Sequence, residues 1–295
     1  MFIVDEFVSN LQMDKVQEYR NLKIIPIKSD MAKEGDIQTL ENALKKEIVE
    51  VTEVTDDDGQ VPYLKFLHNG DGGQPIFVMC GSIITGNLQD RVVKTSFVLK
   101  PYQERKSDVA CVESLRWGAR EKGGISEYHI SSDMRHKLRK STQSQIWNQI
   151  KAKSMRMKVN SDTNRVEDIY QSHESHINTY REHFVCEPTH IGMIVLIDEK
   201  VIGFDLFGIK GLFPKLHHSV ITSFIIDALD EGYHYENMKR KVLTVTEFLS
   251  QIQRARKKYY EPYPNEKVVM FESQEVTGGG LIEDETLLQL EGFVV

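Results

Sequence analysis

Four side chains that could do chemistry fall within one short segment, residues 111–117 with the sequence CVESLRW. Cys111 and Glu113 alternate on one face of an expected strand, and Arg116 and Trp117 follow directly. Glu113 could serve as a general base or bond a ribose diol, while Arg116 holds a phosphate and Trp117 stacks on a base. An internal ion pair explains Glu113 and Arg116 equally well. For Cys111 a buried, inert thiol is favoured, because a nucleophile would need a lowered pKa.

Gln89 and Arg91 form a second pair, two residues apart after a glycine-bounded turn. On an extended strand they would share one face and present an amide beside a guanidinium. Such a pair suits a phosphate or a carboxylate. The alternative is a pair of surface residues on a β-ladder.

Positive charge is concentrated between Arg116 and Lys158. Eleven Lys and Arg residues stand there with three acids, so this basic segment carries +8 in a chain of net charge −7. A field of this kind attracts anions and favours a phosphate-bearing ligand. A solvated helix face, or a docking face for nucleic acid or a protein partner, would have the same composition. The basic side chains that we expect to help hold phosphate are Arg135, Lys137, Arg139 and Lys140.

Three histidines, His173, His176 and His183, share one face of an expected helix over residues 166–184. A histidine stripe can bind zinc, but this spacing differs from the i, i+4 pair of the HExxH motif. We therefore assign no metal and no cofactor, and the sequence leaves open whether these histidines bind a metal. The chain also lacks a GxGxxG motif, a P-loop and a GxSxG elbow.

The composition is that of a globular protein, with 295 residues, 40% hydrophobic and 27% charged. Three cysteines without CxxC spacing argue against a disulfide framework and favour a reducing compartment. No apolar run approaches the length of a membrane helix, and the N-terminus does not resemble a signal peptide. We expect a cytoplasmic protein that does not associate with membranes.

The hydrophobic pattern predicts mainly antiparallel strands at both ends of the chain and helices between them. Asp133 is the expected N-cap of a helix to about Met157, and a third helix follows Pro214. Asp205 lies in an expected strand and is a second candidate carboxylate. The predicted fold class is α+β, with an antiparallel, sandwich-like β core and several packed helices. We expect one domain over residues 1–295, comprising a β-rich part (1–115), a helical insertion (130–187) and a β/α remainder (188–295).

Six stretches of the chain carry a resemblance: 19–27 (YRNLKIIPI), 81–91, 111–117, 192, 203–207 and 216–229. These stretches, in this order, resemble a domain family associated with ADP-ribosylglycohydrolases and rhodanese-phosphatases. The resemblance implies the company of enzymes of NAD and ADP-ribose metabolism, with no reaction assigned to the domain itself. At residues 87–91 the chain has NLQDR where other members have a small residue and Lys before Gln-Asn-Arg, so Gln89 and Arg91 match and Asn87 and Asp90 do not.

Together these observations predict a cytoplasmic protein that binds an ADP-ribose or NAD-derived nucleotide through a basic, tryptophan-containing site. They leave open whether it also acts as a hydrolase or transferase. ADP-ribose-processing enzymes are expected partners from the family context. The alternative is a non-enzymatic module that binds nucleic acid or a protein partner through the basic segment. The candidate catalytic residues are Glu113 and Asp205, and the candidate ligand-binding residues are Gln89, Arg91, Arg116, Trp117, Arg135 and Arg139.

Overall fold

The structure is a computed structural model that describes the chain except for residues 1–2, 56–61, 71–72, 117, 119–120 and 234–240. The chain divides into two compact units. Unit 1 combines Met1–Gly35 with Asn178–Val295, and unit 2 is Asp36–Ile177. The single family domain over residues 1–295 stays a prediction.

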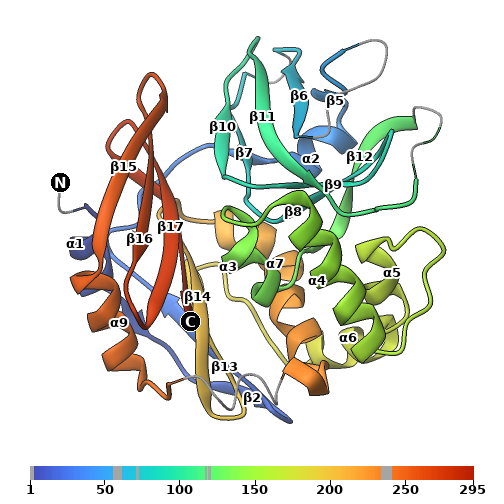
Figure 1. Ribbon diagram of the computed structural model, residues 1–295. Coiled ribbons are helices and arrows are strands. Elements are labelled where there is room, and N and C mark those ends of the chain that lie inside the picture. The colour runs from blue at the N-terminus through green and yellow to red at the C-terminus, as the bar shows by residue number, and fades with distance from the viewer. Residues whose placement is uncertain (1–2, 56–61, 71–72, 117, 119–120, 234–240) are drawn as a thin grey trace. The chain divides into compact units, whose positions relative to one another are not determined.

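Unit 1 is built on a nine-stranded sheet, all of whose paired strands are antiparallel. Strands β15 to β18 form a meander at one end of the sheet, because each is joined to the next by a short turn (Figure 1). The strands are β1 (Gln12–Met13), β2 (Gln17–Tyr19), β3 (Leu22–Lys28), β13 (Gly192–Ile197), β14 (Lys200–Phe207), β15 (Arg256–Tyr263), β16 (Glu266–Glu272), β17 (Val276–Glu283) and β18 (Thr286–Val294).

Helices cover the sheet of unit 1. The apolar residues of α1 (Ile3–Ser9) and α9 (Val245–Arg254) join those of the sheet in one hydrophobic core. Helix α7 (Leu212–Ala228) packs against β13 and β14. It confirms the predicted helix, with Pro214 in its first turn, where the missing N–H costs no hydrogen bond.

Unit 2 contains a six-stranded sheet that nearly closes on itself, since its first and last strands, β12 and β5, lie against each other. A Cβ on Gly123 of β12 would stand 2.2 Å from the carbonyl oxygen of Val51 in β5, so this close approach requires glycine. The strands in sheet order are β12 (Glu121–His129), β8 (Ser82–Asn87), β9 (Arg91–Val93), β11 (Glu104–Cys111), β6 (Tyr63–His68) and β5 (Val49–Thr52).

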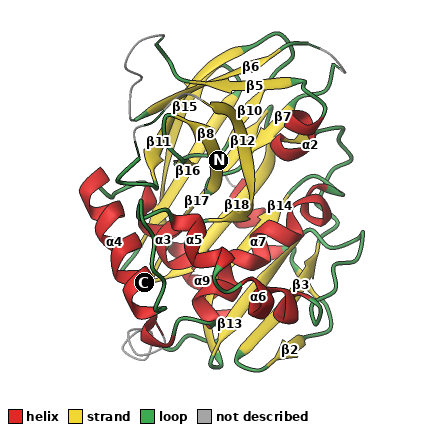
Figure 2. Cartoon of the chain, turned by 90° about the vertical axis from the view of Figure 1, so that its right-hand side faces the viewer, coloured by secondary structure: helices red, strands yellow, loops and turns green. Residues whose placement is uncertain are grey.

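A smaller sheet and several short helices complete unit 2. The sheet consists of β10 (Phe97–Leu99), β7 (Ile76–Val78) and β4 (Gln38–Thr39), of which the last pair is parallel. Figure 2 shows helices in red and strands in yellow, and strands run through both units. The α+β class with an antiparallel β core is thereby confirmed. The helices are α2 (Leu40–Lys45), α3 (Ser132–Leu138), α4 (Gln143–Arg156), α5 (Val166–Gln171) and the first half of α6 (Glu174–Arg181).

The two long helices predicted in the middle of the chain are each divided. The first predicted helix is interrupted at Thr142. The Thr142 side chain accepts a hydrogen bond from the backbone N–H of Gln145, and the Gln145 side chain accepts one from the backbone N–H of Thr142. This capping box starts a new helix, α4. The expected N-cap is also wrong, because Ser131 holds that position and Asp133 lies in the first turn of α3. No helix among the described residues has the length and apolar composition needed to cross a membrane.

Candidate functional site

A buried carboxylate, Asp90, lies at the centre of a network of polar side chains in unit 2. It is fully buried in the turn between β8 and β9, where the backbone N–H of Gly86 donates to its Oδ1 at 3.1 Å. Nη2 of Arg116 donates to the same oxygen at 3.1 Å, and Nε of Arg165 donates to Oδ2. Two guanidinium groups therefore share one carboxylate.

Glu113 lies beside this carboxylate and bonds to the same loops. Its Oε2 accepts Nε of Arg116 at 2.7 Å and the backbone N–H of Asp90 at 3.2 Å, and its Oε1 accepts the hydroxyl of Thr163 at 2.9 Å. An isolated backbone bridge between Glu113 and Arg165 brings the two distant segments together. The ion pair of Glu113 and Arg116, one of the two alternatives that the sequence left open, is therefore present as part of a larger network.

Glu167, at the start of α5, completes the set. Its carboxylate pairs with Nη2 of Arg165 and accepts the hydroxyl of Ser126. We call Asp90, Glu113, Arg116, Arg165 and Glu167 the Asp90 cluster.

Burial shapes the protonation of this cluster. Desolvation raises the pKa of Asp90, although the hydrogen bond and charge of Arg165 oppose the rise. Burial likewise raises the pKa of Glu167, against the hydrogen bond from Ser126. Three acids face two arginines here, and carboxyl groups with raised pKa values beside fixed cations are a common feature of functional sites.

Arg165 is the member of the cluster best placed to meet a ligand. The side chains of Arg116 and Arg165 are 23% and 28% exposed, whereas those of the acids are 1–10% exposed. Every nitrogen of the Arg116 guanidinium donates to a protein oxygen, including weak contacts of 3.5 Å to the carbonyls of Gly86 and Asn87. In the part of the chain that the structure describes, Nη1 of Arg165 has no hydrogen-bond partner.

Gln89 and Arg91 are buried next to this cluster. Gln89 lies before β9 begins, and its amide donates to the carbonyl of Glu113 at 3.0 Å. Nη1 of Arg91 donates to the carbonyl of Gln89 at 2.9 Å, and its Nη2 lies 3.6 Å from the carboxylate of Glu53. Both side chains are therefore engaged with the protein interior.

The structure places the other candidate residues elsewhere. Arg135, in α3, is 1% exposed, and its charge adds to burial in lowering the pKa of His129 to about 3. Arg139 is half-buried at the C-terminal end of α3. Asp205 lies in unit 1, fully buried in β14 opposite Glu291 of β18. Trp117 lies outside the described residues.

Among its described residues, the basic segment is not uniformly exposed. Lys153, like Arg135, is almost fully buried. Lys137 pairs with Asp133 at 2.8 Å and Lys122 pairs with Glu47 at 2.6 Å. Much of the charge that the sequence concentrates here is therefore used inside the protein or neutralised locally.

Cys111, two residues before Glu113, is buried, and burial raises the pKa of its thiol. Its Sγ donates to the carbonyl of Glu113 at 3.0 Å. A thiol with a raised pKa is a poor nucleophile, as the sequence analysis favours.

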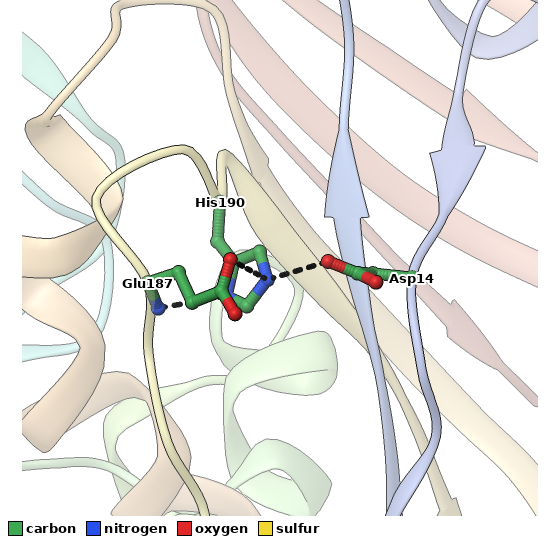
Figure 3. A group of neighbouring side chains, drawn as sticks. All are labelled: Asp14, Glu187 and His190. Carbon is green, nitrogen blue, oxygen red and sulfur yellow. Dashed lines mark hydrogen bonds and ion pairs between the residues drawn. The ribbon is translucent and has the colours of Figure 1, made fainter.

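One group of metal-capable side chains among the described residues lies in unit 1 and consists of Asp14, Glu187 and His190 (Figure 3). The backbone N–H of Glu187 donates to Nδ1 of His190 at 3.0 Å, so Nε2 carries the proton and donates it to Asp14 at 3.1 Å. The ammonium of Lys28 pairs with both carboxylates. The nitrogen and oxygen atoms that could bind a metal therefore already take part in hydrogen bonds or ion pairs within the protein. We call Asp14, Lys28, Glu187 and His190 the Asp14 cluster.

The histidine stripe is not a compact ligand set. The rings of His173 and His176 are 6.4 Å apart between centroids. His183 belongs to unit 1, where its ring stacks on Tyr19 at 3.7 Å. Arg165 and Glu167 were not predicted as site residues, and a role for Asp90 was in doubt. No local spacing reveals Arg165, which lies 75 residues from Asp90.

Comparison with known families identifies the chain. A family model described as "ARPP-1: ARG and Rhodanese-Phosphatase-superfamily-associated Protein domain" matches residues 10–293. The chain belongs to this family. The expected resemblance is confirmed, and the family's description associates it with ADP-ribosylglycohydrolases and rhodanese-phosphatases. No curated protein and no solved structure matches the chain.

Proposed function

We propose that this protein binds an ADP-ribose-type nucleotide at the Asp90 cluster. The observation that carries the proposal is the guanidinium of Arg165, which is held on two sides by Asp90 and Glu167 and leaves Nη1 available. A planar guanidinium fixed in this way is suited to a phosphate oxygen, because little side-chain entropy is lost on binding.

The carboxylates give the same site a capacity for acid–base chemistry at the ribose. Burial raises the pKa of Asp90 and Glu167. Glu113 is held by Arg116 and Thr163 in a different environment. Carboxyl groups whose environments differ can divide the roles of general acid and general base, as hydrolysis of a glycosidic bond requires. Hydrolysis or transfer is therefore the reaction to test, with Glu113 as the proposed base and Arg116 as the residue that positions it.

The family association supports the choice of ligand. The description of the family names the ADP-ribosylglycohydrolase context, and a diphosphate with two riboses offers both an anion and diols to this cluster. We extend this to a cytoplasmic protein of NAD-linked metabolism. A docking module for nucleic acid is less well supported, because Arg135 and Lys153 of the basic segment are buried.

Calorimetric titration with ADP-ribose, NAD, AMP and a short RNA tests the proposal. For the Arg165→Met variant we expect ADP-ribose affinity to fall about tenfold or more, since a hydrogen bond to a charged group contributes about 1.5–3 kcal/mol. Arg254→Met, at an exposed arginine of α9, is the matched control and should bind as the wild type does.

Arg116→Ala separates ligand contact from support of the site. Because the Arg116 guanidinium is fully engaged with protein oxygens, this variant should lose more stability than Arg165→Met. Thermal melts of both variants, with product analysis of the wild type by chromatography, complete the test. Equal ADP-ribose affinity of wild type and Arg165→Met, or a preference for RNA, would contradict the proposal.

A further inference from the structure

In unit 1 the hairpins β15–β16 and β17–β18 lie next to each other in the sheet (Figure 1). A groove lined by residues of unit 1 crosses the turns of these two hairpins. It consists of three adjoining cavities of about 360, 300 and 180 Å³. All three share Glu285. The first two also share Glu261 and Lys267, and the first and third share Ile3. The cavities therefore lie side by side.

The walls of the groove are well fixed. Asn265 ends the β15–β16 turn and Asp284 and Glu285 form the β17–β18 turn, all with positive φ. The backbone N–H of Asp284 donates to the carbonyl of Asn265 at 3.0 Å and ties the two turns together. A site built on linked hairpins is largely formed before its ligand arrives.

The first cavity has an apolar side. Ile282 is 2% exposed and belongs to the core of unit 1, and Ile3 and Tyr259 pack against that core. A side chain of the size of leucine would be covered by these three residues on entering the cavity.

Negative charge surrounds this apolar side. Two lysines, Lys267 and Lys33, line the groove. Nζ of Lys267 lies 3.8 Å from Oε1 of Glu261, and Nζ of Lys33 donates to the hydroxyl of Thr286 at 2.9 Å. The carboxylates of Glu6, Asp284 and Glu285 are exposed and form no ion pair with any described residue. The acids that line the groove are Glu6, Glu261, Glu266, Asp284 and Glu285.

We infer that this groove binds an extended, basic segment of a partner protein, in which Lys or Arg alternates with apolar residues. Such a segment suits the groove, because an apolar side chain can enter the cavity at Ile3, Tyr259 and Ile282. The flanking Lys or Arg side chains begin on the opposite face of the segment, but they are long and flexible enough to bend towards the exposed carboxylates of the groove. The unpaired acids supply charge complementarity, which steers association and selects against acidic segments.

Fluorescence anisotropy of the full chain with a labelled peptide of alternating lysine and leucine tests the inference. We expect saturable binding that weakens with salt, and no binding of the same peptide with glutamate in place of lysine. Glu285→Lys and Glu261→Lys should each weaken binding about tenfold or more, since each places a like charge against the peptide. Glu182→Lys, the same change at an exposed site outside the groove, is the control and should change affinity less than twofold.

Three results would overturn the inference: equal affinity of the groove and control variants, equal binding of the glutamate peptide, or no binding up to about 1 mM peptide. Displacement of the peptide by an equal concentration of spermine would also overturn it, in favour of a polyamine site. ADP-ribose titrations of the groove variants separate this site from the Asp90 cluster, because their ADP-ribose affinity should be unchanged.

Discussion

The Asp90 and Asp14 clusters are alike in composition and opposite in behaviour. Each holds an aspartate between two nitrogen-bearing side chains, Arg116 and Arg165 in one case, Lys28 and His190 in the other. The pKa of Asp90 is raised, whereas the pKa of Asp14 is driven far below its ordinary value. Partner charges alone therefore do not decide the direction of the shift.

Burial accounts for the difference. The side chain of Asp90 is 1% exposed and that of Asp14 is 30% exposed. At Asp90 desolvation is the largest cause, and together with the negative charge of Glu113 it outweighs the effects of Arg165 and Arg116. At Asp14 the hydrogen bonds from Lys28, from the backbone of Lys15 and from His190 outweigh the small desolvation. A buried carboxylate therefore remains costly to ionise even when cations surround it.

The largest expected effect is on stability, from Asp90→Ala. This change leaves the guanidinium groups of Arg116 and Arg165 without their shared carboxylate, and breaking a buried pair costs about 3–5 kcal/mol. Urea denaturation measures the loss. Asp14→Ala, the counterpart in the exposed cluster, should change the free energy of unfolding much less. Similar losses in the two variants would remove the distinction between the clusters.

The pH dependence of stability should have opposite signs in the two clusters. The lowered pKa of Asp14 gives stability that is present above pH 3.8, its ordinary pKa, and lost as the pH falls below that value. Because the pKa of Asp90 is raised, its native state binds a proton more readily than the unfolded chain, and stability is lost as the pH rises through the native pKa.

Melting temperatures of Asp14→Asn and Asp90→Asn against pH, each compared with the wild type, measure this difference. As the pH is lowered below 3.8, the difference in melting temperature between the wild type and Asp14→Asn should shrink. The melting temperature of the wild type relative to that of Asp90→Asn should instead increase as the pH is lowered towards about 3.8. Parallel trends in the two variants would show that burial does not set the sign.

The sequence was informative where structure is local. Turn residues and alternating apolar residues predict the hairpins, and helical spacing after Pro214 predicts α7. The Thr142–Gln145 capping box that divides the predicted helix is also a local signal, and it was overlooked.

The site was only partly predictable. The contact of Glu113 with Arg116 follows from a spacing of three residues, and the structure has it at 2.7 Å. Arg165 reaches Asp90 only because the chain returns to unit 2's sheet after α4, which no spacing reveals. Nor does the alternation of Gln89 and Arg91 reveal that both side chains point into the protein. Long-range pairing and burial are properties of the whole fold, and they decide here which arginine can meet a ligand.

The smallest expected effect on stability comes from Lys28→Met, which tests what lowers the pKa of Asp14 in the more exposed of the two clusters. The Lys28 side chain is 35% exposed, and ion pairs at such positions contribute little to stability, so the melting temperature should fall only slightly. This small fall should disappear below pH 3.8, because it reflects the part of the Asp14 pKa shift that Lys28 causes. The pKa of Asp14, followed by NMR titration, should nevertheless rise towards 3.8, because the hydrogen bond from Lys28 is the largest cause of its depression. Lys45→Met, which removes the exposed pair with Glu41, is the control and should leave Asp14 unchanged. If the pKa of Asp14 stayed low without Lys28, the backbone and His190 would have to hold it there, and the two clusters would differ in geometry as well as in burial.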